Sequence, residues 1–331
     1  MNSFPISAPR INGLPTQLSV IICTHNPRPD YLRRTLAALK TQTLPLDQWE
    51  FLLVDNASQP PVAEGYDLTW HPRARHVQEP ALGLTPARLR GITESCGQWM
   101  IFVDDDNVLV EDYLANALAL ATRHPHLAVL GAGKLLPEFE IPPPPELQHM
   151  LFMLALRDTD APRWGNNPTD ATSLPCGAGM CVQRKIAAQY VALIDVLRIN
   201  TVLDRKGKQL YSHGDDLFSW AAARAGQGFG VFPELRITHL IGAGRLNRKY
   251  FLKLIYFSAF SHWILHFLLA GERPKSMGCL RPLRLIPHAL RRGIFSARCQ
   301  WGWLVGEHRA ARFISGKKLS PAVPVAPKAD C

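Results

Sequence analysis

The chain has 331 residues, enough for one large α/β domain with an extension or for two modest domains. Hydrophobic residues make up 47% and charged residues 19%, a balance that excludes an intrinsically disordered protein. The net charge of +10 is uneven, because residues 271–318 hold eleven basic residues and two acids. This excess suits either a solvated basic surface or one that contacts the phosphates of anionic lipid, nucleic acid or a phosphorylated acceptor.

The seven cysteines are scattered and form no C-x-x-C pair. We therefore expect reduced thiols in a cytosolic protein, not a disulfide framework or a zinc knuckle. Residues 1–15 lack an apolar stretch, so we expect an N-terminal arm there and no secretory signal.

The first part of the chain alternates buried apolar runs with helical patterns. In chain order the predicted elements are a strand at 18–23, a helix at 31–42, a strand at 49–54, a helix at 86–95, a strand at 99–103 and a helix at 110–123. Asp30 is predicted to cap the first helix, and Glu111 and Asp112 suit the start of the last. The alternation is typical of a doubly wound α/β sheet, in which ligands bind at the carboxyl ends of the strands.

The later part of the chain is less regular. A Pro-rich link at 137–145 and a polar loop at 162–175 are followed by a strand-like run at 235–238. Residues 251–270 are apolar and long enough to span a bilayer, but Lys253 and two histidines interrupt them. We favour a helix packed on the catalytic domain, as part of the acceptor wall, over an interfacial helix with a basic flank, and both over a spanning helix.

Three carboxylates, Asp104 to Asp106, directly follow the strand at 99–103. They repel one another unless a cation or hydrogen-bond donors compensate them. If the strand continued, Asp104 and Asp106 would point to the same side and offer two oxygen ligands to Mg²⁺ or Mn²⁺. An acidic turn before the next helix is the alternative interpretation.

Two further polar residues lie near these strand ends. Asp55 ends the strand at 49–54, where it can accept hydrogen bonds from a base or ribose, or shape the turn that follows. Arg88 follows the second strand, and its guanidinium fork suits a diphosphate. The alternative for Arg88 is a helix-surface arginine paired with Glu94.

Four motifs occur in a fixed order along the chain: SVIICTHN at 19–26, LVDNAS at 53–58, GLTPARLRGI at 83–92 and FVDDDN at 102–107. Together with CGAGM at 176–180 and HGDDL at 213–217, they resemble the family 2 glycosyltransferases. The resemblance covers about residues 18–240. It implies the GT-A fold, a Rossmann-like doubly wound mixed sheet, here with a helical C-terminal extension.

The resemblance also implies roles for individual residues. The donor nucleotide would be bound by Thr24, Asn26, Asp55, Arg88 and Asp104, and the metal by Asp106, Asp104 and His239. The donor sugar and acceptor would lie beside Gly177, Ala178, Gly179 and Met180. The catalytic pair would be Asp215 and Asp216, with Asp216 the general base.

The sequence departs from the family pattern at two places. Leu89 follows Arg88, where the family often has asparagine. Asp215 replaces the family's glutamate, which leaves the base open between Asp215 and Asp216. Because a helical pattern starts at Leu217, N-terminal capping is the structural alternative for this pair.

The resulting domain prediction has four parts. Residues 1–15 are an arm, 16–240 the GT-A catalytic domain, 241–314 a basic helical extension that forms an acceptor wall or contacts a membrane surface, and 315–331 a flexible tail.

The function implied by the resemblance is a hexosyltransferase. It would move a sugar from a nucleoside-diphosphate-sugar to a hydroxyl of a glycan or lipid-linked acceptor, with inversion and with Mn²⁺ or Mg²⁺ as cofactor. We expect a cytoplasmic enzyme of polysaccharide synthesis, with the inner face of the plasma membrane as a candidate partner surface. No nucleic-acid partner is expected, because the aromatic residues of the basic region form no stacking module.

Two other functions were weighed. A sugar nucleotidyltransferase needs a Gly-rich phosphate loop after the first strand, where this chain has Thr24 to Pro27. A catalytically inactive sugar-nucleotide or glycan-binding protein would be expected to lack Asp106 or Asp216, and both are present.

Overall fold

The computed structural model describes residues 16–197, 203, 205, 207, 209–275, 293–317 and 319–321. The predicted arm at 1–15 and most of the predicted tail at 315–331 lie outside these residues. The chain divides into two compact units. The first comprises Met1–Glu138, Phe152–Ala192 and Asp215–Ile241, and the second comprises Phe139–Leu151, Leu193–Gly214 and Gly242–Cys331.

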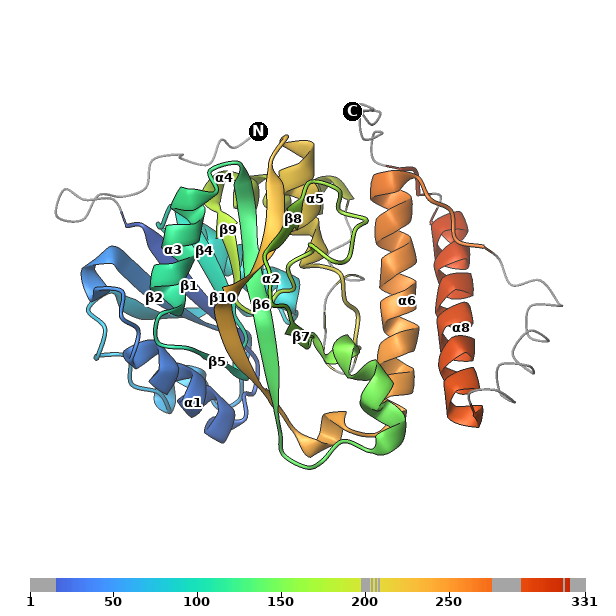
Figure 1. Ribbon diagram of the computed structural model, residues 1–331, viewed down its shortest axis with the longest axis horizontal. Coiled ribbons are helices and arrows are strands. Elements are labelled where there is room, and N and C mark those ends of the chain that lie inside the picture. The colour runs from blue at the N-terminus through green and yellow to red at the C-terminus, as the bar shows by residue number, and fades with distance from the viewer. Residues whose placement is uncertain are drawn as a thin grey trace. The chain divides into compact units, whose positions relative to one another are not determined.

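Within the described residues, the first unit is built on one mixed sheet (Figure 1). Its strand order is β3-β2-β1-β4-β9-β6-β10-β5, with β7 paired to β6 and β8 paired to β10. The strands are β1 (Leu18–Thr24), β2 (Trp49–Asp55), β3 (Ala74–Gln78), β4 (Trp99–Val103), β5 (Asn107–Leu109), β6 (Leu127–Phe139), β7 (Arg157–Asp158), β8 (Arg163–Gly165), β9 (Met180–Gln183) and β10 (Gly228–Ile241).

Helices cover both faces of this sheet. They are α1 (Pro29–Lys40), α2 (Leu84–Glu94), α3 (Tyr113–Arg123), α4 (Arg184–Leu197) and α5 (Asp216–Arg224). The apolar side chains of α1 and α3 share one core cluster with Val20 and Ile22 of β1. On the opposite face, α2 packs so closely that a Cβ at Gly91 would lie 2.6 Å from Cγ2 of Ile21. The predicted doubly wound arrangement is therefore confirmed.

Strand pairing aligns the carboxyl ends of the central strands. β1 runs parallel to β2 and β4, with Thr24 opposite Asp55 and Ile22 opposite Val103. β9 runs antiparallel to β4, with Met180 opposite Phe102. The chain that enters β9 therefore arrives at the edge where β1, β2 and β4 end.

The start of α1 differs from the prediction. Arg28 is the N-cap and Pro29 the first helical residue, so Asp30 does not cap the helix. Proline suits this position because the first helical N–H needs no partner and its φ is already helical. Asp30 instead forms an ion pair with Arg28 at 2.7 Å.

The segment after β4 also differs. The strand ends at Val103, so the assumption of a continued strand was wrong for the three aspartates. They form a turn closed by a 3.1 Å hydrogen bond from the Asn107 amide to the Asp104 carbonyl. β5 follows this turn, and α3 therefore begins at Tyr113 and not at residue 110. The polar loop at 162–175 likewise contains a strand that was not predicted, β8.

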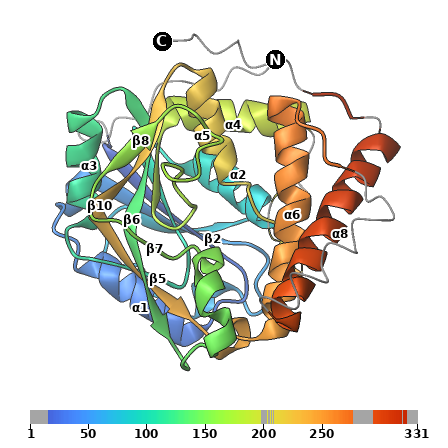
Figure 2. The same ribbon diagram turned by 45° about the vertical axis from the view of Figure 1, so that its right-hand side comes forward.

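The second unit contains two long helices, α6 (Arg248–Ala270) and α8 (Ile294–Gly316), which lie side by side (Figures 1 and 2). The Asn247 side chain caps α6 by accepting the Tyr250 amide at 3.0 Å. Gly271 ends it with a φ of 72°. Among the described helices, α6 alone is long and apolar enough to cross a membrane by length and composition. Within the second unit it packs along α8, while its predicted packing on the catalytic domain stays a prediction.

Gly306 sets the distance between α6 and α8. A Cβ at this position would lie 2.5 Å from the Tyr256 carbonyl oxygen and 2.8 Å from Cβ of Ala259. Gly302, one turn earlier, has no atom closer than 3.7 Å to the same point. Only Gly306 therefore needs to lack a side chain for the helices to approach this closely.

Alanine at these two glycines should have opposite effects. We expect Gly306→Ala to lower the free energy of unfolding by about 1–3 kcal/mol, because its methyl group meets backbone. Gly302→Ala should leave it unchanged or raise it by up to about 1 kcal/mol, because alanine favours helix over glycine. Urea unfolding of the full chain, followed by circular dichroism, measures both. Equal losses in the two variants would contradict the role of Gly306.

Candidate functional site

The turn Asp104 to Asp106 is fixed from both sides. The Thr24 hydroxyl donates to the Asp105 carboxylate, and the Thr35 hydroxyl donates to the Asp105 carbonyl at 3.1 Å. Asn107, which is fully buried, donates from Nδ2 to Oδ1 of Asp106 at 3.0 Å. Asp105 is thus bound toward β1 and α1, while Asp106 is oriented by the residue that begins β5.

β10 brings His239 to Asp106. His239 lies opposite Asn107 in the antiparallel pairing of β10 with β5. Its Nε2 is 3.4 Å from Oδ2 of Asp106, and its side chain is buried. The Leu240 amide also donates to the Asp106 carbonyl at 2.8 Å. Two of the residues predicted to bind metal are therefore adjacent.

The Cys176 thiol is influenced by two of the predicted site residues, Asp104 and Asp215. Burial raises the pKa of the Cys176 thiol to about 12; Arg157 opposes this shift, whereas Asp215 and Asp104 add to it. Both carboxylates therefore lie near the start of the glycine-containing loop at 177–180. The thiol itself stays protonated at neutral pH, so Cys176 contributes no thiolate nucleophile.

Asp55 shapes the loop after β2. Its Oδ1 accepts the Ser58 amide and its Oδ2 accepts the Val62 amide, both at 2.9 Å. These bonds match the turn role that was weighed for it. Each carboxylate oxygen can accept a second hydrogen bond, so a contact with a base or ribose stays a prediction.

Asn26 ties the end of β1 to the same loop. Its amide donates to the Ser58 hydroxyl at 2.9 Å, and its Oδ1 accepts the Gln59 amide at 2.8 Å. Its φ of 47° lies in the left-handed region, which asparagine tolerates better than most residues. Thr24, which holds Asp105, lies just before it. The nucleotide contacts of Thr24 and Asn26 stay predictions.

Arg88 is a buried residue of α2 and not a surface residue. It is 5% exposed, and it is Arg90 that pairs with Glu94, at 2.9 Å. The helix-surface interpretation of Arg88 is therefore wrong. A Cβ at Gly177 would lie 2.7 Å from Nη2 of Arg88. The guanidinium thus reaches the loop at 177–180.

Asp215 contacts the same loop. Its Oδ2 accepts the Gly177 amide at 2.6 Å. Although it occupies the N-cap position of α5, its side chain makes no capping bond, so the capping interpretation is wrong for this residue. Asp216 follows as the first residue of α5 and is partly exposed. The N-terminus of the helix favours the ionised form of its carboxylate.

The loop itself requires glycine. Gly179 has a φ of 70°, and a Cβ there would collide with Tyr113 and Ile237. The Tyr113 hydroxyl donates to the Gly179 carbonyl at 2.7 Å. Burial raises the pKa of Tyr113, which keeps this hydroxyl a donor. Ala178 and Met180 are buried beneath the loop.

Sequence reasoning missed Tyr113 and Asn107. Tyr113 has the pattern of a core residue of α3, and Asn107 that of a turn residue. Neither pattern indicates that the residue supports a functional site. Only the pairing of β5 with β10, and the position of α3 under Gly179, assign them that role.

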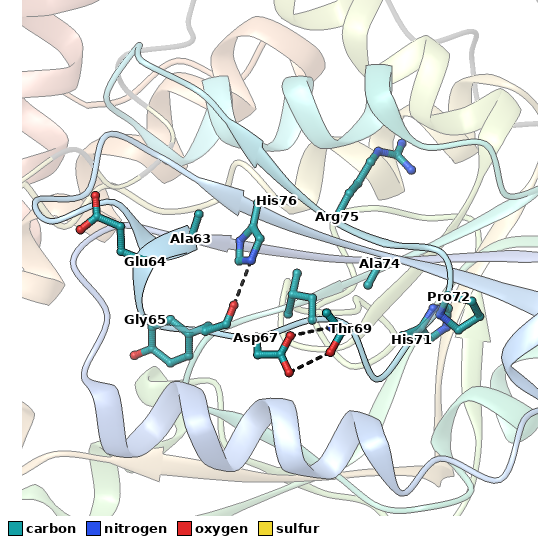
Figure 3. Close-up of a pocket in the computed structure, with 12 residues that line it drawn as sticks. Ala63, Glu64, Gly65, Asp67, Thr69, His71, Pro72, Ala74, Arg75 and His76 are labelled. Carbon is teal, nitrogen blue, oxygen red and sulfur yellow. Dashed lines mark hydrogen bonds between the residues drawn. The ribbon is translucent and has the colours of Figure 1, made fainter.

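A cavity of about 850 Å³ lies along the connection from β2 to β3, lined by residues between Ala63 and His76 (Figure 3). His76 donates to the Tyr66 carbonyl at 3.0 Å, and Asp67 accepts from Thr69 at 2.9 Å. None of the site residues predicted from the sequence lines this cavity.

Comparison with protein families decides the class of this enzyme. Residues 19–154 match the model described as Glycosyl transferase family 2. These residues are a family 2 glycosyltransferase domain. The matched segment includes the Asp104 to Asp106 turn, Asp55 and Arg88. The predicted family and enzyme class are thereby confirmed.

The chain is similar to several solved structures of glycosyltransferases. The mannosyltransferase PcManGT from Pyrobaculum calidifontis, in complex with GDP-Man and Mn²⁺, is 16% identical with a TM-score of 0.52 over 94% of this chain and 78% of that one. S. aureus TarS 1–349 is 16% identical with a TM-score of 0.47 over 92% of each chain, and its complex with UDP-GlcNAc scores 0.46 at 15% identity over 91% and 92%. No curated protein matches the sequence. The predicted GT-A fold class is confirmed.

The bond from Asp215 to Gly177 should be needed for stability. We expect Asp215→Ala to lower the free energy of unfolding by about 1–3 kcal/mol, because it leaves the Gly177 amide without its acceptor. Asp215→Asn should cost less, since its amide oxygen still accepts. Asp170 accepts the Thr172 amide at 3.0 Å on the surface, so Asp170→Ala is the matched control, with an expected loss under about 0.5 kcal/mol. Urea unfolding that gives Asp215→Ala and Asp170→Ala the same loss would contradict this role.

Proposed function

We propose that this glycosyltransferase moves a sugar from a nucleoside-diphosphate-sugar to an acceptor hydroxyl with inversion, using a divalent metal ion held at Asp106 and His239. The observation that carries the proposal is the 3.4 Å approach of His239 Nε2 to Asp106 Oδ2 at the carboxyl ends of the strands of a family 2 domain.

The two residues suit a divalent ion. The His239 Nε2 and Asp106 Oδ2 atoms, 3.4 Å apart, are close enough for both to bind one ion. A carboxylate oxygen and an imidazole nitrogen are both ligands that Mn²⁺ accepts. No cluster of three or more His, Cys, Asp or Glu that could hold a metal occurs in the described part of the chain. Asp106 and His239 would therefore supply two ligands, and the donor diphosphate and water would supply the rest.

The donor would lie across the edge where β1, β2 and β4 end. When bound, the metal ion would supply positive charge that neutralises the departing diphosphate. Arg88 would add a fixed cation, because its burial beside Gly177 orients the guanidinium before the donor arrives. Asn26 and Asp55, already held by the loop at 58–62, would contact the nucleoside together with Thr24, whose hydroxyl donates to Asp105.

Asp216 would take the proton of the acceptor hydroxyl. A hydroxyl is a weak nucleophile at neutral pH, so a carboxylate near it lowers the barrier by removing its proton as the bond forms. Asp216 lies at the start of α5, where the helix dipole favours a negatively charged group. Asp215 would not compete for this role, because its Oδ2 is engaged by the Gly177 amide at 2.6 Å. Attack from the side opposite the diphosphate would invert the anomeric centre.

The comparison structures support the donor class without naming the donor here. PcManGT was solved with GDP-Man and Mn²⁺, and it has the same fold as this chain at 16% identity. The acceptor would be a glycan or lipid-linked sugar. An inactive sugar-nucleotide-binding protein is the competing proposal, and it predicts donor binding without turnover.

Thermal unfolding with nucleotides tests the metal and the donor together. We expect UDP, GDP or dTDP to raise the unfolding midpoint by about 5 °C or more at a hundredfold excess over Kd, and only with Mn²⁺ present. Asp106→Ala and His239→Ala should abolish the shift. Asp160→Ala, which removes an almost fully exposed carboxylate, should retain it. A shift of equal size without metal would refute the metal role, and no shift with any nucleotide would refute the donor class.

Hydrolysis of the donor tests the base. Water can replace the unknown acceptor, and the released nucleoside diphosphate reports turnover. We expect Asp216→Asn to lower kcat by about 10²–10⁴-fold while the thermal shift by nucleotide persists. Asp215→Asn should lower kcat less. Turnover absent from the wild type with every sugar nucleotide, despite binding, would favour the inactive binding protein.

A further inference from the structure

We propose that the outer face of α8 lies on the surface of an anionic lipid bilayer. The proposal concerns the second unit alone and does not depend on the chemistry proposed for the first. It rests on the distribution of charge, burial and aromatic residues around this helix.

α8 has two different faces. The inner face, with Cys299, Gly306, Ala310 and Ile314 buried, packs in the second unit beside α6 (Figure 2). The exposed residues of the outer face recur at helical spacing and are Ile294, Arg298, Trp301 and Arg312. A helix with one apolar face buried in protein normally has a mixed polar surface on the other.

The exposed charge of α8 has one sign. Arg298 and Arg312 are exposed, as is Lys317 just after the helix, whereas Arg309 donates to the Tyr256 hydroxyl of α6. The one acid in the helix, Glu307, is buried and accepts the Lys275 amide at 2.9 Å. It therefore does not offset the arginines at the surface. Among the described residues, neither Arg298 nor Arg312 forms an ion pair with a carboxylate.

Large apolar side chains accompany these cations. Ile294 is 76% exposed and Trp301 is 40% exposed, although both belong to an ordered helix. An acidic protein or a nucleic acid would explain the arginines but not the exposed isoleucine. Tryptophan and arginine on one helix face are typical of helices that lie in the headgroup region, with the apolar side chains inserted and the cations at the lipid phosphates.

Α membrane contact of this kind is peripheral and sensitive to salt. The helix would be held by a few inserted apolar side chains and by ionic contacts with anionic headgroups, and salt screens these ionic contacts. Since α6 is packed against α8 within the unit, neither helix needs to cross the bilayer. The contact should therefore be reversible.

Vesicle co-sedimentation of the full chain tests the proposal. We expect binding to vesicles of phosphatidylcholine with 30% phosphatidylglycerol at about 0.1 M salt, release at about 1 M salt, and at least tenfold weaker binding to pure phosphatidylcholine. Arg298→Gln with Arg312→Gln should weaken binding to the anionic vesicles about tenfold or more. Ile294→Ser with Trp301→Ser should do the same without changing the salt dependence.

Matched variants of exposed residues outside α8 are the controls. Arg123→Gln with Arg163→Gln, and Val196→Ser on α4, remove similar groups and should leave vesicle binding within twofold. Circular dichroism checks that every variant is folded. Equal binding to neutral vesicles, no loss in the α8 variants, or resistance to 1 M salt would overturn the proposal. So would binding of the wild type to duplex DNA or polyglutamate in place of vesicles, which would assign the face to another partner.

Discussion

A three-residue antiparallel ladder between β5 and β10 brings together the two residues of the proposed metal site. The parallel strands β1, β2 and β4 align their carboxyl ends by pairing alone, so Thr24, Asp55 and Asp104 meet at one edge. The ladder does something that this pairing cannot: it places His239, from a distant part of the chain, against Asp106. It also fixes the backbone of the turn, through the bond from the Leu240 amide to the Asp106 carbonyl at 2.8 Å.

Polar residues beneath this edge are buried at a cost in stability. Arg88, Asn107 and His239 all lie in the interior, where a charged or polar group must be compensated by its neighbours. Apolar residues would fill the same space more stably if only the fold mattered. The loop at 177–180 adds a second constraint, since Gly177 makes room for the guanidinium and Gly179 for Tyr113. Such a concentration of costly features at one edge argues for a working site rather than a scaffold that merely retains the fold.

The sequence predicts the framework of this site better than its details. Strands buried on both faces are continuous apolar runs, so β1, β2 and β4 could be located almost to the residue. β5 could not, because three residues show no periodicity and their pairing depends on β10. The burial of Arg88 depends equally on a distant segment, the loop at Gly177, and the weak apolar pattern of α2 gives no sign of it. The sequence motifs identified the site residues, but the contacts of these residues depend on tertiary packing and could not be predicted.

Whether an apolar helix spans a bilayer or packs inside a protein depends on the element that lies beside it, and α6 of the second unit is an example. By length and composition α6 could cross a bilayer. Its buried side chains instead pack within the second unit beside α8, at a short distance that Gly306 permits. Burial of Glu307 then leaves the arginines of α8 without an opposing carboxylate from their own helix. The apolar surface of α6 is used inside the protein, and what remains for lipid is a narrow face with cations and one tryptophan. A contact built this way is governed by salt and lipid charge rather than by hydrophobic length.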